Sequence, residues 1–393
     1  MTHSIKHIYP FPARMAPDIA LEHVRDLPDN ALIADPMCGS GTVLRVAAEC
    51  GHRCIGFDLD PLAVLMSRVW TTAVDLDAVR TASAELIAAG NRLEGDVALP
   101  WIDGCPETCA FVDRWFEPPQ REPLRRIAYL LAPRVGPIAD VLRLALSRTI
   151  ITKERGASIA RDTSHSRPHT WCVGNTYDVW KGFEIAIERL SQRLRPEEVK
   201  GTVVANQGDA RKLPAVPDGV ADAIISSPPY LNAIDYLRGH RLALVWLGYG
   251  VRELRTIRAV SIGTEQAARG LPSDLIAEWL HAASDQTGNL RRRERGMLQR
   301  YAEDVATMVH EAKRMLKPNG RMTLVVGNSQ LQNVFIKNSK IFELAARASG
   351  FDLLRSTTRE LLAANRYLPI SPNMQASALD KRMREEVILT FVT

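Results

Sequence analysis

A glycine-rich turn between a short apolar run and a helix constrains the fold of this chain more than any other feature. Residues 31–35 are predicted as a buried strand, and residues 36–42 follow it as a tight turn. Residues 43–50 have the pattern of a helix, and residues 54–58 have that of a second strand ending in an acid. A strand, a turn, a helix and a second strand form a βαβ unit, which predicts an open, doubly wound α/β sheet.

The turn has the features of a ligand-binding loop. Gly39 and Gly41 let the backbone approach a ligand, and the following helix N-terminus offers free N–H groups. A P-loop needs a Lys-Ser/Thr pair after its last glycine, and a dinucleotide fingerprint needs a third glycine where this chain has Leu44. The remaining interpretation is S-adenosylmethionine (AdoMet), with Asp35 facing its cationic amino-acid end and Asp58 accepting both ribose hydroxyls.

The strand–helix alternation is interrupted and then resumes. Residues 76–199 contain many prolines and several amphipathic helical patterns, which predict a mostly helical insertion. Residues 1–75 and 200–393 are expected to form one α/β domain around it. Late strands at 351–357 and 386–392 are predicted to close the sheet as an antiparallel pair.

A second motif, Ser227-Pro228-Pro229-Tyr230, follows a predicted central strand at 221–225. Because proline has no N–H group, the backbone carbonyls and the Ser227 hydroxyl converge as hydrogen-bond acceptors. An exocyclic base amine donates two hydrogens, and Tyr230 offers a stacking face to a base rotated out of its helix. The structural alternative is a strand-ending turn packed by an aromatic ring. Because the motif follows the glycine loop in an alternating fold, the catalytic interpretation is favoured.

With these motifs the chain resembles the amino-methylating DNA methyltransferases, the cytosine-N4 and adenine-N6 enzymes. The glycine loop resembles their first motif, and Asp58 resembles the acid after their second strand. Residues 208–210 resemble their third motif, and residues 227–230 resemble their catalytic motif. Residues 7–15 resemble the segment that, in this family, precedes the glycine motif and closes over the methionine end of the cofactor.

The resemblance implies a Rossmann-like class I methyltransferase fold with an AdoMet-dependent seven-stranded sheet. It also implies that Leu59 packs against the adenine ring of AdoMet and that Asp209 or a neighbour contacts this ring. The expected cofactor-binding residues are Phe11, Asp35, Pro36, Gly39, Gly41, Thr42, Asp58, Leu59, Asp209 and Ala210.

The residue at position 227 bears on the target base. Serine favours cytosine N4, because the adenine enzymes of this family more often carry Asp or Asn there. Cytosine C5 is disfavoured, because that chemistry needs a nucleophilic thiol, usually after a proline, and the chain has no Pro-Cys dipeptide. The expected reaction is site-specific, direct transfer to a flipped-out base. Adenine N6, an RNA or protein substrate, and a catalytically silent DNA-binding subunit remain as alternatives.

The charge of the chain permits an acidic partner. The net charge is +5, and the basic residues are ten Lys and forty Arg, whose planar fork suits phosphates and guanine edges. Double-stranded DNA is the expected partner, and a cognate restriction endonuclease is left open. The insertion at 76–199 is the candidate recognition region. Arg291 to Arg295 are interpreted with equal weight as a DNA contact or as a solvated helix face. The predicted DNA contacts are Arg161, His165, Arg167, Arg238 and Arg241.

Other features of the sequence narrow the class of protein. No apolar run approaches the ~20 residues of a membrane-spanning helix, and the first residues lack a signal-peptide core. A cytoplasmic protein without membrane association is expected, located at the nucleoid when it acts on DNA. The six cysteines are interpreted as reduced thiols. A structural zinc site is disfavoured by the loose Cys-x3-Cys spacing of its candidate ligands, which are Cys105, Cys109, His165, His169 and Cys172. No metal is therefore expected. The oligomeric state is left open.

Overall fold

The computed structural model describes residues 7–9, 11, 14–150, 156–161, 169–170, 174–231, 236–262, 273–360 and 385–393. The chain forms two compact units, each assembled from segments that are distant in sequence. The first, here called the sheet unit, comprises Phe11–Leu59, Lys200–Ala233 and Ala259–Thr393. The second, the helical unit, comprises Met1–Pro10, Asp60–Val199 and Ile234–Arg258.

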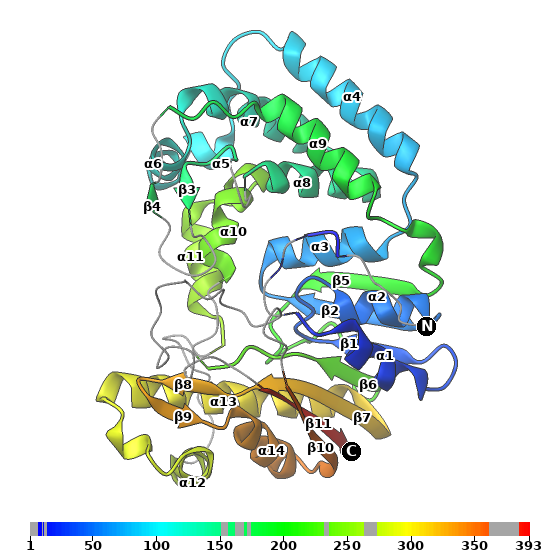
Figure 1. The fold of residues 1–393 in the computed structure, drawn as a ribbon, viewed down its shortest axis with the longest axis vertical. Coiled ribbons are helices and arrows are strands. Elements are labelled where there is room, and N and C mark those ends of the chain that lie inside the picture. The colour runs from blue at the N-terminus through cyan, green and yellow to red at the C-terminus, as the bar shows by residue number, and fades with distance from the viewer. Residues whose placement is uncertain are drawn as a thin grey trace. The chain divides into compact units, whose positions relative to one another are not determined.

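The sheet unit is built on seven strands in the order β10-β11-β7-β6-β1-β2-β5 (Figure 1). The strands are β1 (Leu32–Asp35), β2 (Arg53–Asp58), β5 (Thr202–Gln207), β6 (Ala221–Ser226), β7 (Leu316–Gly327), β10 (Asp352–Glu360) and β11 (Glu385–Val392). Five of them, from β5 to β7, are parallel, and β11 lies antiparallel between β7 and β10. The predicted mostly parallel sheet with a closing antiparallel pair is confirmed.

The parallel strands bring several polar residues to one edge of the sheet. β6 is an apolar run that is buried at all but one position, as expected for a central parallel strand covered on both faces. β1, β2 and β6 end at Asp35, Asp58 and Ser226. Because the three strands are parallel, these residues lie at the same carboxyl edge, where ligands bind in open α/β sheets.

The helices of the sheet unit form two groups. They are α1 (Pro17–Arg25), α2 (Thr42–Glu49), α12 (Ser273–Ala283), α13 (Arg292–Met315) and α14 (Asn338–Ala348). α1 packs on α2, while α12 and α13 pack on α14, and α13 and α14 also contact β7. A hairpin of β8 (Ser329–Leu331) and β9 (Val334–Ile336) follows β7. α13 begins at Arg292, so the arginines at 292–295 lie in its first turn.

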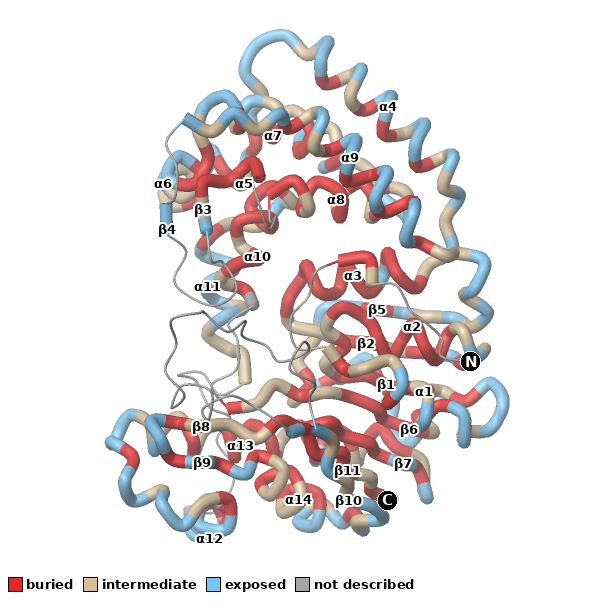
Figure 2. The backbone as a smooth tube through the Cα atoms, viewed as in Figure 1, coloured by how far each residue is buried: buried red, intermediate tan, exposed pale blue. Residues whose placement is uncertain are grey.

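The helical unit is centred on a helix that is buried at nine of its 14 positions. This is α8 (Pro137–Ile150), which contacts α3, α4, α7, α9 and α10 and which Figure 2 shows as mostly buried. The other helices are α3 (Pro61–Thr71), α4 (Leu76–Arg92), α5 (Pro100–Asp103), α6 (Pro106–Trp115), α7 (Pro118–Leu131), α9 (Val179–Ser191), α10 (Tyr236–Leu244) and α11 (Val251–Ala259). Two short strands, β3 (Ala160–Arg161) and β4 (His169–Thr170), pair with each other.

The compact units do not follow the predicted domain boundaries. The described part of residues 76–199 is mostly helical, as the sequence indicates, but α3, α10 and most of α11 belong to the same unit as this insertion. The functional division into a catalytic domain and a recognition insertion therefore stays a prediction. Within the described residues, no helix is both long and apolar enough to cross a membrane.

Candidate active site

The loop after β1 is shaped by two glycines in the left-handed region. Gly39 has φ 50° and Gly41 has φ 87°, values that side chains disfavour and glycine adopts freely. The amide of Cys38 donates to the carbonyl of Phe57 at 2.8 Å, and the amide of Gly39 donates to Asp58 Oδ2 at 2.9 Å. The loop is thus tied to the end of β2, and α2 begins directly after it with Gly41 as N-cap.

Packing of α2 on β2 explains how Leu44 is accommodated. A Cβ placed on Gly56 would lie 2.4 Å from Cδ1 of Leu44, so only glycine fits opposite this side chain. In a dinucleotide fingerprint the third glycine, on the helix, permits the close approach of helix and strand. Here the glycine that permits it is on the strand, which agrees with the rejection of the dinucleotide interpretation.

Asp35 is a buried carboxyl group at the end of β1. Its exposed fraction is 2%, and Oδ1 accepts hydrogen bonds from Ser226 Oγ at 2.7 Å and from the Met37 amide at 3.2 Å. Burial raises the pKa of Asp35 to about 7, although the Ser226 hydrogen bond opposes the shift. A cation beside this carboxyl group would favour its ionised form.

The residues of the loop fit AdoMet in space and in charge. A Cβ on Gly39 would lie 3.2 Å from the ring of Phe11, a tight contact that glycine avoids. Asp35 and Asp58, at the ends of neighbouring strands, suit an ammonium group and a pair of hydroxyl donors. Pro36 and Thr42 are buried on either side of the two glycines, and Thr42 is the first residue of α2.

The remaining predicted cofactor residues lie at the ends of β2 and β5. The carbonyl of Leu59 accepts a hydrogen bond from Gln207 Nε2 at 3.0 Å, and the amide of Gly208 donates to the carbonyl of Asp58 at 3.0 Å. Ala210 is buried in the core of the sheet unit. Contact of these residues with the adenine ring stays a prediction.

Asp209 takes part in an ion-pair network that sequence analysis missed. Arg211 binds its carboxylate with two nitrogens, Nε to Oδ1 at 3.0 Å and Nη2 to Oδ2 at 2.6 Å. Nη1 of Arg211 reaches Oδ1 of Asp304, a fully buried residue of α13, at 2.6 Å. The Asp209 carboxylate is therefore ion-paired within the protein, and the third motif is attached to α13.

Three hydrogen bonds hold the Ser-Pro-Pro-Tyr turn at the end of β6. Ser226 Oγ donates to Asp35, as described above, and Ser227 Oγ donates to the carbonyl of Val325 on β7 at 3.3 Å. The carbonyl of Pro229 accepts a hydrogen bond from the hydroxyl of Tyr301 at 3.1 Å. The turn is thus connected to β1, β7 and α13. Because Ser227 donates its proton to β7, its oxygen lone pairs can accept from a substrate.

Tyr301 is the second site residue that the sequence did not single out. It lies in α13, is 1% exposed, and packs edge-on against Phe342 with ring centroids 6.5 Å apart. Burial raises the pKa of Tyr301, so its hydroxyl keeps its proton and acts as a donor. In the sequence, Tyr301, Val305 and Val309 recur at helical spacing, which indicates a buried face and nothing about the catalytic turn.

The predicted DNA-contacting residues that the structure describes lie in the helical unit. Arg161 is exposed on β3, and Arg238 and Arg241 are half-buried on α10, three residues apart and so on one face. The guanidinium of Arg241 lies 5.2 Å from the ring centroid of Phe111, a cation–π contact. His165 and Arg167 lie outside the described residues.

α10 is fixed within the helical unit by a buried pair. His240 Nδ1 and Asp60 Oδ2 are 2.5 Å apart, and both side chains are 8% exposed. Asp60 also caps α3, accepting a hydrogen bond from the Leu62 amide at 2.9 Å ahead of Pro61 at the first helical position. The helix that follows the catalytic motif is thereby joined to the helix that follows the Asp58 strand.

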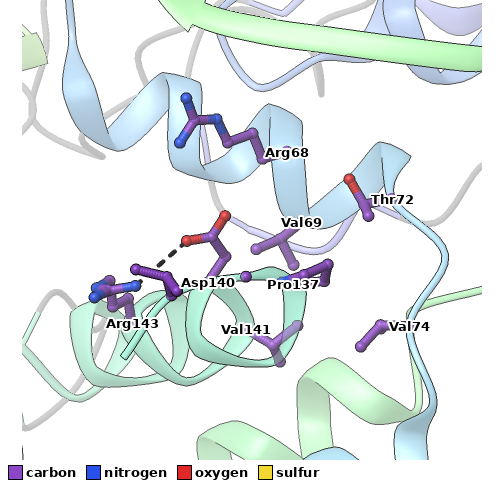
Figure 3. A pocket seen from close by; sticks show the side chains of 10 residues that line it. Arg68, Val69, Thr72, Val74, Pro137, Asp140, Val141 and Arg143 are labelled. Carbon is purple, nitrogen blue, oxygen red and sulfur yellow. Dashed lines mark ion pairs between the residues drawn. The ribbon is translucent and has the colours of Figure 1, made fainter. Parts of the chain in front are cut away.

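A cavity of about 400 Å³ lies in the helical unit between α3 and α8 (Figure 3). Its charged groups interact with one another: Asp140 pairs with Arg143 at 3.5 Å, and burial raises the pKa of Asp140 although the charges of Arg68 and Arg143 oppose the shift. Arg143 also donates to the carbonyl of Leu131 at 2.9 Å, near the end of α7. No predicted site residue lines this cavity, and its charges have structural partners.

Only some of the candidate zinc ligands lie among the described residues. Cys105 and Cys109 are half-buried free thiols near the start of α6 and within it. His165 and Cys172 lie outside the described residues. Among the residues that are described, no group of three or more His, Cys, Asp or Glu side chains could hold a metal ion.

The sheet order and the site at its carboxyl edge define a class of protein. A glycine loop and two acids lie at the ends of neighbouring parallel strands, with an acceptor-rich turn on the adjacent strand. The chain has the Rossmann-like class I methyltransferase fold, with a glycine loop and two acids that suit AdoMet as cofactor.

Comparison with known proteins narrows this class. Type II methyltransferase M.MvaI of Kocuria varians is 22% identical over 425 residues, a match that covers 98% of this chain and 89% of the relative. Type II methyltransferase M.BsoBI of Geobacillus stearothermophilus is 32% identical over 76 residues, covering 19% of this chain and 15% of that protein. The predicted resemblance to the DNA methyltransferase family is confirmed by the type II relatives.

Solved structures add a weaker similarity. An S-adenosylmethionine-dependent methyltransferase from Mesorhizobium loti is 11% identical, with a TM-score of 0.34 over 96% of this chain and all of that one. At this score the fold assignment rests on the strand order described above. No protein-family model matches the chain.

Proposed function

We propose that the chain transfers a methyl group from AdoMet to an exocyclic amine of a base in duplex DNA, and that this amine is N4 of cytosine. The broader assignment, a DNA methyltransferase, follows from the type II relatives. The observation that carries transfer to an exocyclic amine is the hydrogen bond from Ser226 to Asp35, which joins the acceptor-rich turn to the cofactor loop. The groups that would hold the amine and those that would hold AdoMet are therefore adjacent.

In the proposed reaction, AdoMet supplies an electrophilic methyl group on its sulfonium, and the protein orients the amine. Ser227 Oγ and the carbonyl of Pro228 accept the two amine hydrogens, because the Ser227 proton goes to Val325 and the Pro229 carbonyl is bound by Tyr301. Accepting both hydrogens directs the nitrogen lone pair toward the methyl group. Formation of the N–C bond would break the methyl–sulfonium bond, with S-adenosylhomocysteine as the leaving group, and the nitrogen would release one proton to water. Tyr230 stacks on the flipped-out base, and no covalent enzyme intermediate is needed.

The choice of cytosine rests on Ser227. The amino-methylating enzymes that this chain resembles more often carry Asp or Asn at that position when the target is adenine. Adenine N6 is the alternative within the same mechanism. A DNA-binding subunit without activity is the alternative from another class, and it would bind AdoMet or DNA without transferring the methyl group.

The partners of the proposed enzyme follow from its relatives' names. Duplex DNA is the substrate, and the type II names support a restriction–modification context with a cognate endonuclease. The insertion at 76–199, with Arg161 and the α10 arginines, stays our candidate for reading the recognition sequence.

Two substitutions test the assignment of the catalytic turn. Ser227→Ala removes one acceptor, so kcat for methyl transfer should fall roughly 100- to 1000-fold, as when one preorganised hydrogen bond is lost elsewhere. Tyr230→Ala should lower both DNA affinity and turnover, because base stacking contributes roughly 1–3 kcal/mol. The assay is transfer of label from AdoMet to DNA, with AdoMet affinity measured by calorimetry.

The control is Ser349→Ala, a serine next to the last turn of α14 and remote from the turn in the fold. It should retain full activity, and all three variants should bind AdoMet as the wild type does. Full activity in both Ser227→Ala and Tyr230→Ala would remove the turn from the active site. AdoMet binding without any transfer in the wild type would instead support the silent-subunit alternative.

A further inference from the structure

Positive charge in this protein is concentrated outside the helical insertion. Residues 76–199 carry 17 basic and 17 acidic side chains, whereas residues 236–300 carry 11 basic and six acidic ones. Four of these basic residues, Arg291, Arg292, Arg293 and Arg295, occupy the N-cap and first turn of α13. All four are exposed, and within the part of the chain that the structure describes none of them forms an ion pair. We call these four residues the α13 arginine surface.

The α13 arginine surface lies beyond the carboxyl edge of the sheet, the same edge at which the catalytic turn lies. The Tyr301 hydroxyl bonds to Pro229, just beyond the carboxyl end of β6, so this point of α13 is at the carboxyl edge. α13 ends where β7 begins, so its earlier residues extend further beyond that edge. With a rise of 1.5 Å per residue, Arg292 lies about 13 Å along the helix axis from Tyr301.

Because the β8–β9 hairpin binds the acidic side chain at this end of α13, the arginines are the charged groups that face solvent there. Gln332 Nε2 donates to Glu294 Oε1 at 2.7 Å, which directs the acid among the arginines toward the hairpin. Leu298, one turn further on, is fully buried. On the outer side of the hairpin Phe335 is 48% exposed, an apolar side chain that can pack on sugars or bases beside the charges.

From this arrangement we infer that the α13 arginine surface binds the phosphate backbone of duplex DNA next to the target base. The inference rests on the proposed function and adds a location for backbone binding on the sheet unit itself. Arginine suits the task because its fork binds phosphate with two nitrogens and stays charged at every physiological pH. Contacts of this kind fix the orientation of the duplex but carry no sequence information.

The electrostatic origin of the contact gives it a measurable signature. Each neutralised phosphate releases condensed counterions, so the logarithm of affinity falls with the logarithm of salt concentration by about 0.9 per contact. Loss of two arginines should therefore reduce the slope by about two. The effect should be the same on any sequence, so a random 30-base-pair duplex serves as the probe.

The experiment measures anisotropy of this labelled duplex between 50 and 200 mM KCl with Arg292→Gln/Arg295→Gln. The matched control is Arg25→Gln/Arg347→Gln, which removes the same charge from the opposite edge of the sheet. Arg25 ends α1, just before β1, and Arg347 is in the last turn of α14, just before β10, which is parallel to β7. A third variant, Arg292→Lys/Arg295→Lys, keeps the charge.

The arginine-to-glutamine variant should bind DNA roughly tenfold more weakly, with the reduced slope, while its AdoMet affinity stays that of the wild type. The control and the lysine variant should keep a slope near the wild-type value. If the Arg292→Gln/Arg295→Gln slope equals that of the control, the inference is overturned and the proposed function stands. If the wild type itself shows no salt-dependent duplex binding, both are overturned.

Discussion

Two neighbouring serines at the end of β6 have different hydrogen-bond partners. Ser226 points into the sheet and bonds to the buried Asp35, whereas Ser227 bonds to the backbone of β7. Since alternate residues of a strand face opposite sides, one serine contacts the cofactor loop and the other is available to the substrate. At this scale the sequence singled out Ser227 and Asp35, whose roles toward substrate and cofactor stay predictions, but it contained no signal for Ser226.

The raised pKa of Asp35 predicts that AdoMet binding depends on pH. Asp35 must be ionised to pair with the ammonium group, and its pKa is about 7, so affinity should rise as pH rises through that value. We expect AdoMet to bind roughly tenfold more weakly at pH 6 than at pH 8, since each pH unit below the pKa costs about a factor of ten. Calorimetry at both pH values, in two buffers of different ionisation enthalpy, measures the affinity and counts the released proton.

Asp35→Asn provides the control for this prediction. It should weaken AdoMet binding but raise the free energy of unfolding at high pH. A carboxyl group whose pKa is raised on folding contributes stability at low pH and loses it as pH rises toward the folded value. Relative to wild type, Asp35→Asn should therefore be stabilised by roughly 2–3 kcal/mol more at pH 8 than at pH 5, in urea unfolding. Its AdoMet affinity should be low at both pH values. A wild-type affinity that does not change with pH would exclude Asp35 as the ammonium partner.

At the scale of elements, patterns of neighbouring residues predict individual strands and helices, whereas contacts between distant residues fix how these elements are joined. The strands and helices around the glycine loop were predicted because apolar periodicity and glycine positions are local signals. Residues 291–300, where α13 starts, carry little such signal, because they are mostly charged or polar and only Met297 and Leu298 among them are large apolar residues. The Arg211–Asp304 and Tyr301–Pro229 contacts join residues 93 and 72 positions apart, which no local pattern encodes.

α13 supports the catalytic turn through a single hydroxyl group, which makes Tyr301 a positioning residue. Tyr301→Phe keeps the ring packed on Phe342 and removes only the donor to the Pro229 carbonyl. The loss should cost about 1 kcal/mol in the free energy of unfolding and let the turn relax. We expect kcat for methyl transfer to fall roughly 10-fold, because misplacement of the acceptors raises the barrier, while the affinity for AdoMet stays unchanged.

Tyr129→Phe is the matched control, since it removes a hydroxyl from an exposed tyrosine of α7. It should leave kcat, AdoMet affinity and stability at their wild-type values. The split between kcat and cofactor affinity separates positioning from general stability. Should Tyr301→Phe lose stability while retaining full kcat, its hydroxyl would be structural only.

At the scale of the whole molecule, two compact units divide the predicted functions. The predicted cofactor and catalytic residues belong to the sheet unit, while the predicted DNA contacts that are described belong to the helical unit. The insertion was predicted from a loss of strand–helix alternation, which is a signal in the sequence. That α3 and α10 share a core with it could not be predicted, because the His240–Asp60 pair joins residues 180 positions apart.

The product of the reaction tests the central claim most directly. Purified protein is incubated with plasmid DNA and AdoMet carrying a labelled methyl group, and the DNA is digested to nucleosides and separated. We expect the label in N4-methylcytosine, because Ser227 and the Pro228 carbonyl orient an exocyclic amine for direct transfer. Label in N6-methyladenine would keep the mechanism and contradict the choice of base. Label in 5-methylcytosine, or in no nucleoside, would contradict the account itself.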